Sequence, residues 1–91
     1  MTHRYLITGR VQGVGFRWFV EREARALGVS GWVRNTEGGA VEVLAGGTTE
    51  QLAQLRAKLK EGPRAARVDE VQEIEEERQE TGSSFQILGA W

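Results

Sequence analysis

The order in which hydrophobic patterns follow one another constrains the fold of this 91-residue chain more than any other feature. Alternation over Arg4–Val11 predicts a strand, and apolar residues then recur at helical spacing over residues 16–27. Gly28 stands where a glycine commonly ends a helix. Ser30–Asn35 is expected to be a strand, and Gly38–Gly39 is a hairpin turn signal. The first half is therefore interpreted as strand, helix and the first strand of a hairpin.

The second half repeats the order of strand, helix and strand. Residues 41–45 alternate as the second strand of the hairpin. Thr48 and Gln51 form a capping-box pattern ahead of a leucine stripe over residues 52–59, and Gly62–Pro63 follows that stripe. A second amphipathic helix is therefore expected between these two signals.

The C-terminal third gives a mixed signal. Val68, Val71 and Ile74 recur at a spacing of three, which by period alone favours a helix. The order of elements requires a strand there, so we expect a strand, followed by a short extra strand at residues 85–87. The resulting β-α-β-β-α-β order is the split βαβ arrangement, in which two helices cover one face of an antiparallel sheet. The length predicts one α+β domain over residues 1–91.

Composition excludes several kinds of site. The chain has no cysteine and one histidine, His3, which excludes thiolate nucleophiles and cysteine-ligated zinc and argues against a Ser-His-Asp triad. No stretch approaches the roughly 18 apolar residues of a membrane span, and we expect a cytoplasmic protein. A sequence pI of about 5.8 argues against a nucleic-acid-binding domain. Residues 1–34 carry six arginines against two glutamates, which fits a local anion site, whereas the acidic segment 69–80 is expected to be a hydrated surface.

A glycine-rich segment, Gln12-Gly13-Val14-Gly15, joins the first strand to the first helix. Because glycine tolerates positive φ, successive amides can point into one concavity at the helix N-terminus, where the helix dipole favours anions. Arg17, in the first helical turn, can add a planar cation that binds phosphate oxygens in pairs. The same residues also fit a tight turn followed by an exposed arginine, and both interpretations stand at this point.

The second candidate segment surrounds Asn35, the only asparagine in the chain. An asparagine at the end of a strand is commonly a turn former. Its carboxamide can also donate and accept hydrogen bonds without ionising, so it can hold a water molecule beside a bound phosphate.

Together the two segments resemble the acylphosphatase family, through the patterns G-x-V-Q-G-V-x-F-R at residues 9–17 and G-W-V-R-N-x-x-x-G-x-V at residues 31–41. The similarity continues to Ile87 and so covers essentially the whole chain. The resemblance implies a ferredoxin-like α/β sandwich and hydrolysis of acyl phosphates to carboxylate and inorganic phosphate. It also implies a small monomeric enzyme that needs no metal or other cofactor.

The resemblance also assigns roles by motif position. Arg17 matches the family's phosphate-binding arginine, and Asn35 matches its water-orienting asparagine. The phosphate cradle matches the backbone amides of six consecutive residues, which are Gln12, Gly13, Val14, Gly15, Phe16 and Arg17. The implied partners are a small acyl phosphate and the product phosphate, with no nucleic acid and no membrane.

Two other functions remain alternatives: a non-catalytic phosphate- or anion-binding module of the same fold, and an RNA-binding domain. The presence of both Arg17 and Asn35 favours the enzyme, and the basic-aromatic signature of RNA-binding sandwiches is absent from the sequence. Trp18 lies off the apolar stripe of its helix and is expected at the rim of the site. Five other aromatic residues are expected in the core: Tyr5, Phe16, Phe19, Trp32 and Phe85.

Overall fold

The computed structural model describes residues 1–76 and 81–89, and its elements follow the expected order. In chain order they are β1 (Thr2–Arg10), α1 (Phe16–Leu27), β2 (Ser30–Asn35), β3 (Val41–Gly46), α2 (Thr49–Glu61), β4 (Arg67–Glu75) and β5 (Phe85–Ile87). Residues 77–80 of the acidic segment lie outside the described residues, as do residues 90–91.

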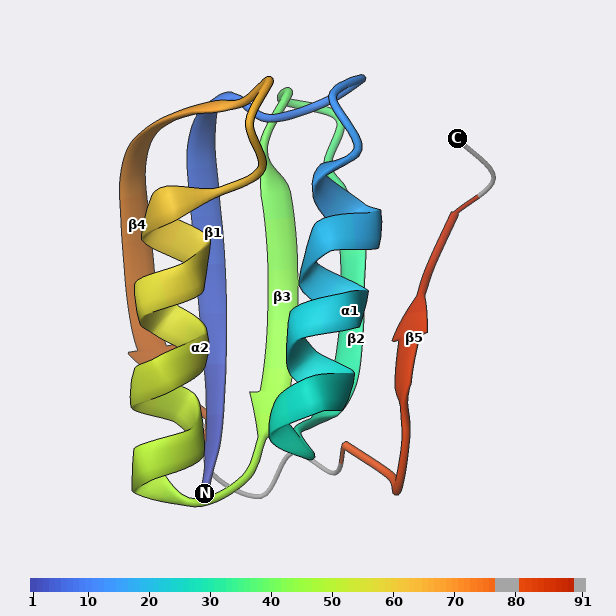
Figure 1. Cartoon of the computed structure of the whole chain (residues 1–91), viewed down its shortest axis with the longest axis vertical. Helices are drawn as coiled ribbons and strands as arrows, with labels where there is room; N and C mark the ends of the chain where they lie inside the picture. The colour runs from blue at the N-terminus through green and yellow to red at the C-terminus, as the bar shows by residue number, and fades with distance from the viewer. Residues whose placement is uncertain (77–80, 90–91) are drawn as a thin grey trace.

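The five described strands form one sheet in the order β4-β1-β3-β2-β5, and α1 and α2 lie side by side on one face of it (Figure 1). β1 pairs antiparallel with β3 and β4, β2 pairs antiparallel with β3, and β5 runs parallel to β2. The predicted α+β sandwich is confirmed, and the short extra strand makes its sheet mixed. The β1–α1 loop, the β2–β3 turn and the α2–β4 connection gather at one end of the sheet, the top in Figure 1.

β4 is the expected strand, and a β-bulge explains its misleading period of three. The pairing register with β1 skips Asp69, so Val68 and Val71 both face the core and pack against it. Alternation then resumes and places Ile74 on the opposite face, where it is 57% exposed. Gly9 lies in β1 opposite the bulge, where the backbone of β4 leaves no room for a side chain. The helix-like spacing therefore comes from one extra residue in a strand.

The core lies between the sheet and the two helices. Three of the aromatic residues expected there are fully buried, and these are Tyr5, Phe16 and Phe85. Phe19 is partly buried and packs at the edge of the core. The prediction for Trp32 is wrong: Val33 faces the core, so alternation turns Trp32 to the face that no helix covers. There the Arg34 guanidinium lies 4.8 Å from the centroid of the indole.

Both helices begin and end at the signals expected for them. Gly28 is a left-handed C-cap whose amide donates to the carbonyls of the last turn of α1. Thr48 and Gln51 form the capping box of α2, and Gly62 is its C-cap. Within residues 1–76 and 81–89, neither helix is long and apolar enough to cross a membrane.

Candidate active site

The β1–α1 loop leaves an open space in front of the first residue of α1. Gly13 and Gly15 have φ angles of 75° and 78°, which glycine adopts without the strain that a side chain would add. A Cβ at either position would meet no heavy atom of the described residues within 4 Å. Gly15 is the N-cap of α1, and no side chain in the described part of the chain caps the helix there. The positive end of the helix dipole therefore faces this space.

A pocket of about 320 Å³, called here the phosphate pocket, opens over this loop. Its lining joins the loop and the first turn of α1 to the end of β2: Val11, Gln12, Gly13, Gly15, Phe16, Arg17, Trp18 and Asn35. The two side chains predicted to carry the chemistry, Arg17 and Asn35, thus line one pocket from two different elements. Of the six residues predicted to form the cradle, Val14 alone does not line it and packs against the core instead.

The C-terminal segment holds the side chain of Arg17. The half-buried guanidinium donates through Nη1 to the carbonyl oxygen of Leu88 at 3.0 Å. The amide of Leu88 donates in turn to the carbonyl of Val33 at 2.8 Å, which continues the parallel pairing of β5 with β2. A guanidinium has five N–H donors, so further donors remain for an anion in the pocket. Sequence reasoning missed Leu88, because a backbone carbonyl leaves no signal in residue type.

The side chain of Gln12 is the second contribution that sequence reasoning missed. Its Nε2 donates to the carbonyl oxygens of Thr36 and Ala40, at 2.8 Å each. These two carbonyls belong to the β2–β3 turn directly after Asn35. Gln12 therefore ties the loop under the open space to the strand end that carries Asn35. The one sequence signal that could have indicated these hydrogen bonds is a long carboxamide side chain beside two loop glycines.

The charges around the phosphate pocket favour an anion. Among the described residues that line it, Arg17 is the only one with a charged side chain. Asn35 adds a neutral group that can bond a water molecule beside the bound anion. Within residues 1–76 and 81–89, no three His, Cys, Asp or Glu side chains lie close enough together to hold a metal ion. The arrangement can therefore bind a tetrahedral oxyanion next to an oriented water.

Comparisons with known proteins place the chain in a family. The model of the acylphosphatase family matches residues 3–87. An acylphosphatase from Koribacter versatilis is 59% identical over 91 residues, covering 99% of this chain and 82% of that protein. The crystal structure of acylphosphatase from Bacillus subtilis superposes with a TM-score of 0.93 at 36% identity, covering 97% of this chain and 98% of that one.

HypF from T. kodakarensis also contains this fold, with a TM-score of 0.85 at 28% identity. That match covers 99% of this chain but 12% of HypF, so it concerns one part of a much longer protein. The acylphosphatases match along most of both chains, which favours the enzyme over a non-catalytic binding module. The chain therefore belongs to the acylphosphatase family, the enzymes that hydrolyse acyl phosphates to a carboxylate and inorganic phosphate.

Proposed function

We propose that the phosphate pocket is the active site and that its two polar side chains divide the work. As a member of its family, the enzyme hydrolyses the carboxyl–phosphate bond of acyl phosphates. The phosphoryl group lies over the backbone of residues 12–17, and Arg17 bonds its oxygens. Asn35 holds the attacking water beside the phosphorus atom. The observation that carries this proposal is that Arg17 and Asn35 line one pocket over Gly13 and Gly15. Both glycines have a left-handed backbone conformation and open space where a side chain would lie.

The chemistry needs little from the protein beyond position and charge. The oxygen of the water attacks phosphorus, and the bond from phosphorus to the acyl oxygen breaks. The carboxylate leaves with the electron pair, and because it is a good leaving group it needs no general acid. One proton of the water passes to a phosphoryl oxygen of the substrate, so no protein base is required. Catalysis then comes from orientation and from stabilising charge on the transferring group.

Single substitutions separate the two roles. If Arg17 grips the phosphoryl group in both the ground and transition states, Arg17→Ala weakens phosphate binding and also collapses turnover. Asn35→Ala leaves phosphate affinity nearly intact and lowers kcat by about 10²–10³-fold, the effect of losing one preorganised hydrogen-bonding group. Arg17→Lys restores activity only in part, because an ammonium cannot reproduce the planar fork. Arg67→Ala is the matched control, since Arg67 is exposed and lines none of the described pockets.

The measurements are phosphate affinity by calorimetry and steady-state turnover of acetyl phosphate. Two results contradict the division of labour: a wild-type kcat in Asn35→Ala, or a loss of phosphate binding in Asn35→Ala as large as in Arg17→Ala. Phosphate itself should inhibit competitively, because it is the product and fits the same pocket.

We further propose that residues 1–91 form a single domain that works as a monomer in the cytoplasm, without metal or other cofactor and without a nucleic-acid or membrane partner. The family and the acidic pI support this. Turnover should survive dialysis against a chelator, and sedimentation should give the mass of one chain. Loss of activity on chelation, with rescue by a divalent ion, would contradict the metal-free mechanism.

A further inference from the structure

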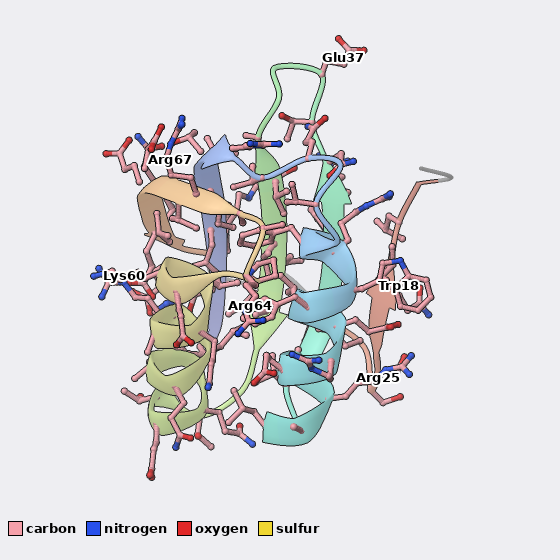
Figure 2. All side chains as sticks on the ribbon, turned by 45° about the horizontal axis from the view of Figure 1, so that its top comes forward. Trp18, Arg25, Glu37, Lys60, Arg64 and Arg67 are labelled. Atoms are coloured by element: carbon pink, nitrogen blue, oxygen red, sulfur yellow. The ribbon has the colours of Figure 1, made fainter. Side chains whose placement is uncertain are left out.

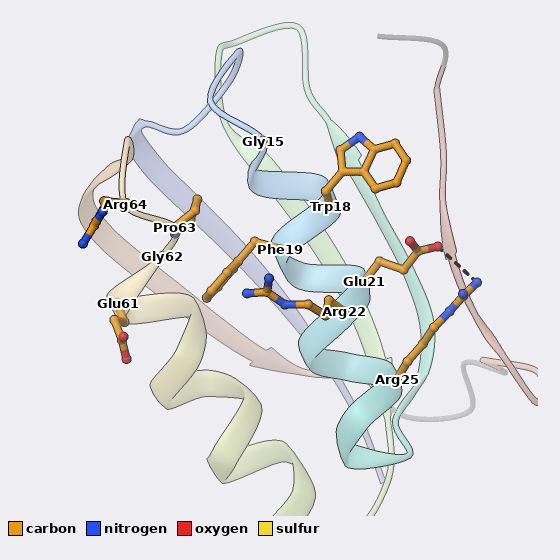
Figure 3. A pocket seen from close by; sticks show the side chains of 10 residues that line it. All are labelled: Gly15, Trp18, Phe19, Glu21, Arg22, Arg25, Glu61, Gly62, Pro63 and Arg64. Atoms are coloured by element: carbon orange, nitrogen blue, oxygen red, sulfur yellow. Dashed lines mark ion pairs between the residues drawn. The ribbon is translucent and has the colours of Figure 1, made fainter.

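A second hollow adjoins the phosphate pocket and shares part of its lining. This hollow, called here the α1 groove, has a volume of about 810 Å³ and lies along α1 beside the end of α2 (Figure 3). Gly15 and Trp18 line both the α1 groove and the phosphate pocket. Small-molecule sites commonly have volumes of about 300–1,000 Å³, so the groove is large enough for a substrate group.

The passage between the two hollows is open. Gly15 is exposed, and a Cβ there would meet no heavy atom of the described residues within 4 Å. The backbone of Gly15 therefore lies between the two hollows without a side chain to close the way. A group bonded to a phosphoryl in the phosphate pocket can extend across Gly15 into the α1 groove.

Apolar side chains border this passage on both flanks of α1. Trp18 is 73% exposed, which is unusual for a side chain with so much apolar surface. Figure 3 shows Trp18 on one flank of α1 and Phe19 on the other, where Phe19 faces Pro63 of the α2–β4 connection. The Phe19 ring is already covered by the Arg22 guanidinium, 5.7 Å from its centroid, so Trp18 supplies the free aromatic surface. A flat aromatic surface next to a passage favours an aromatic group over a small aliphatic one.

The side of the α1 groove formed by the α2–β4 connection offers a cation with no partner among the described residues. Arg25 pairs with Glu21 at 3.1 Å on the helix. Arg22 pairs with Glu23 at 3.2 Å. Arg64 lines the groove from the α2–β4 connection, on the other side of α1 from Trp18 (Figure 2), and it makes no ion pair or hydrogen bond within the described residues. Its guanidinium is therefore available to a negative group on the ligand.

From these observations we propose that the α1 groove binds the acyl part of the substrate, and that the preferred acyl group is aromatic with a negative charge at its far end. The ring lies against Trp18 beside Gly15, and the distal anion extends across the α1 groove toward Arg64. This inference rests on the proposed function, because it assumes that the phosphoryl group occupies the phosphate pocket.

Three substrates test the groove. Acetyl phosphate is too short to enter it, benzoyl phosphate places a ring in it, and 4-carboxybenzoyl phosphate adds the distal anion. The readout is the ratio of kcat/KM between two substrates, compared between wild type and variant, so that intrinsic leaving-group reactivity cancels. Trp18→Ala should lower the benzoyl-to-acetyl ratio about fivefold, the effect of losing one aromatic contact. Arg64→Gln should lower the carboxybenzoyl-to-benzoyl ratio about threefold, as expected for an exposed ion pair, and salt should do the same.

Two surface substitutions serve as matched controls. Ile74→Ala removes an exposed apolar side chain on the opposite face, and Lys60→Gln removes an exposed cation of α2 that does not line the groove. Both should leave the two ratios unchanged. Ratios that stay at wild-type values in Trp18→Ala and Arg64→Gln overturn the acyl assignment, as does an equal loss on all three substrates. Loss of acetyl phosphate turnover in Arg17→Ala tests the phosphate pocket separately, so failure of the groove and failure of the proposed active site are distinguishable.

Discussion

Gln12→Met tests whether the loop under the phosphate pocket must be tied to the strand end that carries Asn35. The substitution keeps the length of the side chain but removes both donated hydrogen bonds, each 2.8 Å long. The two acceptor carbonyls keep another partner each, because Thr36 also accepts from Gly39 and Ala40 also accepts from Thr36. No buried acceptor is left unpaired, so the cost is the net value of two hydrogen bonds, about 1–2 kcal/mol of unfolding free energy.

The effect on turnover should exceed the effect on stability. Under the proposed function, a loop released from the β2–β3 turn would no longer fix the distance between a phosphoryl group over residues 12–17 and a water on Asn35. Misplacement of reacting groups by about 1 Å can cost about 100-fold, so we expect kcat to fall between about tenfold and 100-fold. Urea unfolding gives the stability change, and steady-state hydrolysis of acetyl phosphate at 25 °C gives kcat.

Gln51→Met is the control that makes this prediction sharp. Gln51 also makes two side-chain hydrogen bonds of 2.8 Å to backbone groups, one donated to the carbonyl of Leu27 and one accepted from the amide of Thr48. It lies at the start of α2, at the end of the sheet opposite the phosphate pocket (Figure 1). We expect a similar loss of stability and an unchanged kcat. If Gln12→Met lost stability but kept wild-type kcat, as Gln51→Met should, the positioning role of Gln12 would be refuted.

Two further predictions concern the open loop and the core. Gly13→Ala should cost about 1–2 kcal/mol of stability through its φ of 75° and should also weaken phosphate binding measured by calorimetry, whereas Gly39→Ala, at a φ of 91° in the β2–β3 turn, should cost stability alone. Burial, and then the charge of Glu73, raise the pKa of the Tyr5 hydroxyl well above its ordinary value. Because the unfolded chain releases this proton near pH 10 and the folded chain does not, stability should fall above pH 10 by up to about 1.4 kcal/mol per pH unit, and urea unfolding of Tyr5→Phe should lack that component.

The fold could be predicted because the local patterns outside β4 agreed with the order of elements in the whole chain. Residue type alone marked two helix ends: the capping pair Thr48 and Gln51 marked the start of α2, and Gly28 marked the end of α1. β4 shows why period by itself was insufficient. Its apolar spacing depends on a bulge at Asp69, and a bulge is set by pairing with β1 rather than by the sequence of β4. The requirement for a strand at that place in the order was the stronger evidence.

Trp32 shows the opposite error, in which residue type outweighed position. Trp32 is expected in the core as one of the aromatic residues, although alternation with the buried Val33 turns it away from the helices. On that uncovered face it lies beneath the Arg34 guanidinium, which covers part of the ring. The two-residue period of the strand predicts the correct side for Trp32, because the face of one residue in β2 fixes the faces of all the others.

In the candidate site, the side chains could be expected from the sequence, whereas the backbone group that orients one of them could not. The family resemblance singled out Arg17 and Asn35, and the structure places both in the lining of one pocket. Their roles toward phosphate and water are the proposal made above. The group that orients Arg17 is the backbone carbonyl of Leu88. Any residue type that allows the strand pairing to form would present the same carbonyl at this position. What positions this carbonyl is the parallel pairing of β5 with β2, a contact between distant segments. The direction of the guanidinium therefore depends on topology. A substitution in β5 that weakens its pairing with β2 should lower phosphate affinity, even though the substituted side chain does not line the pocket.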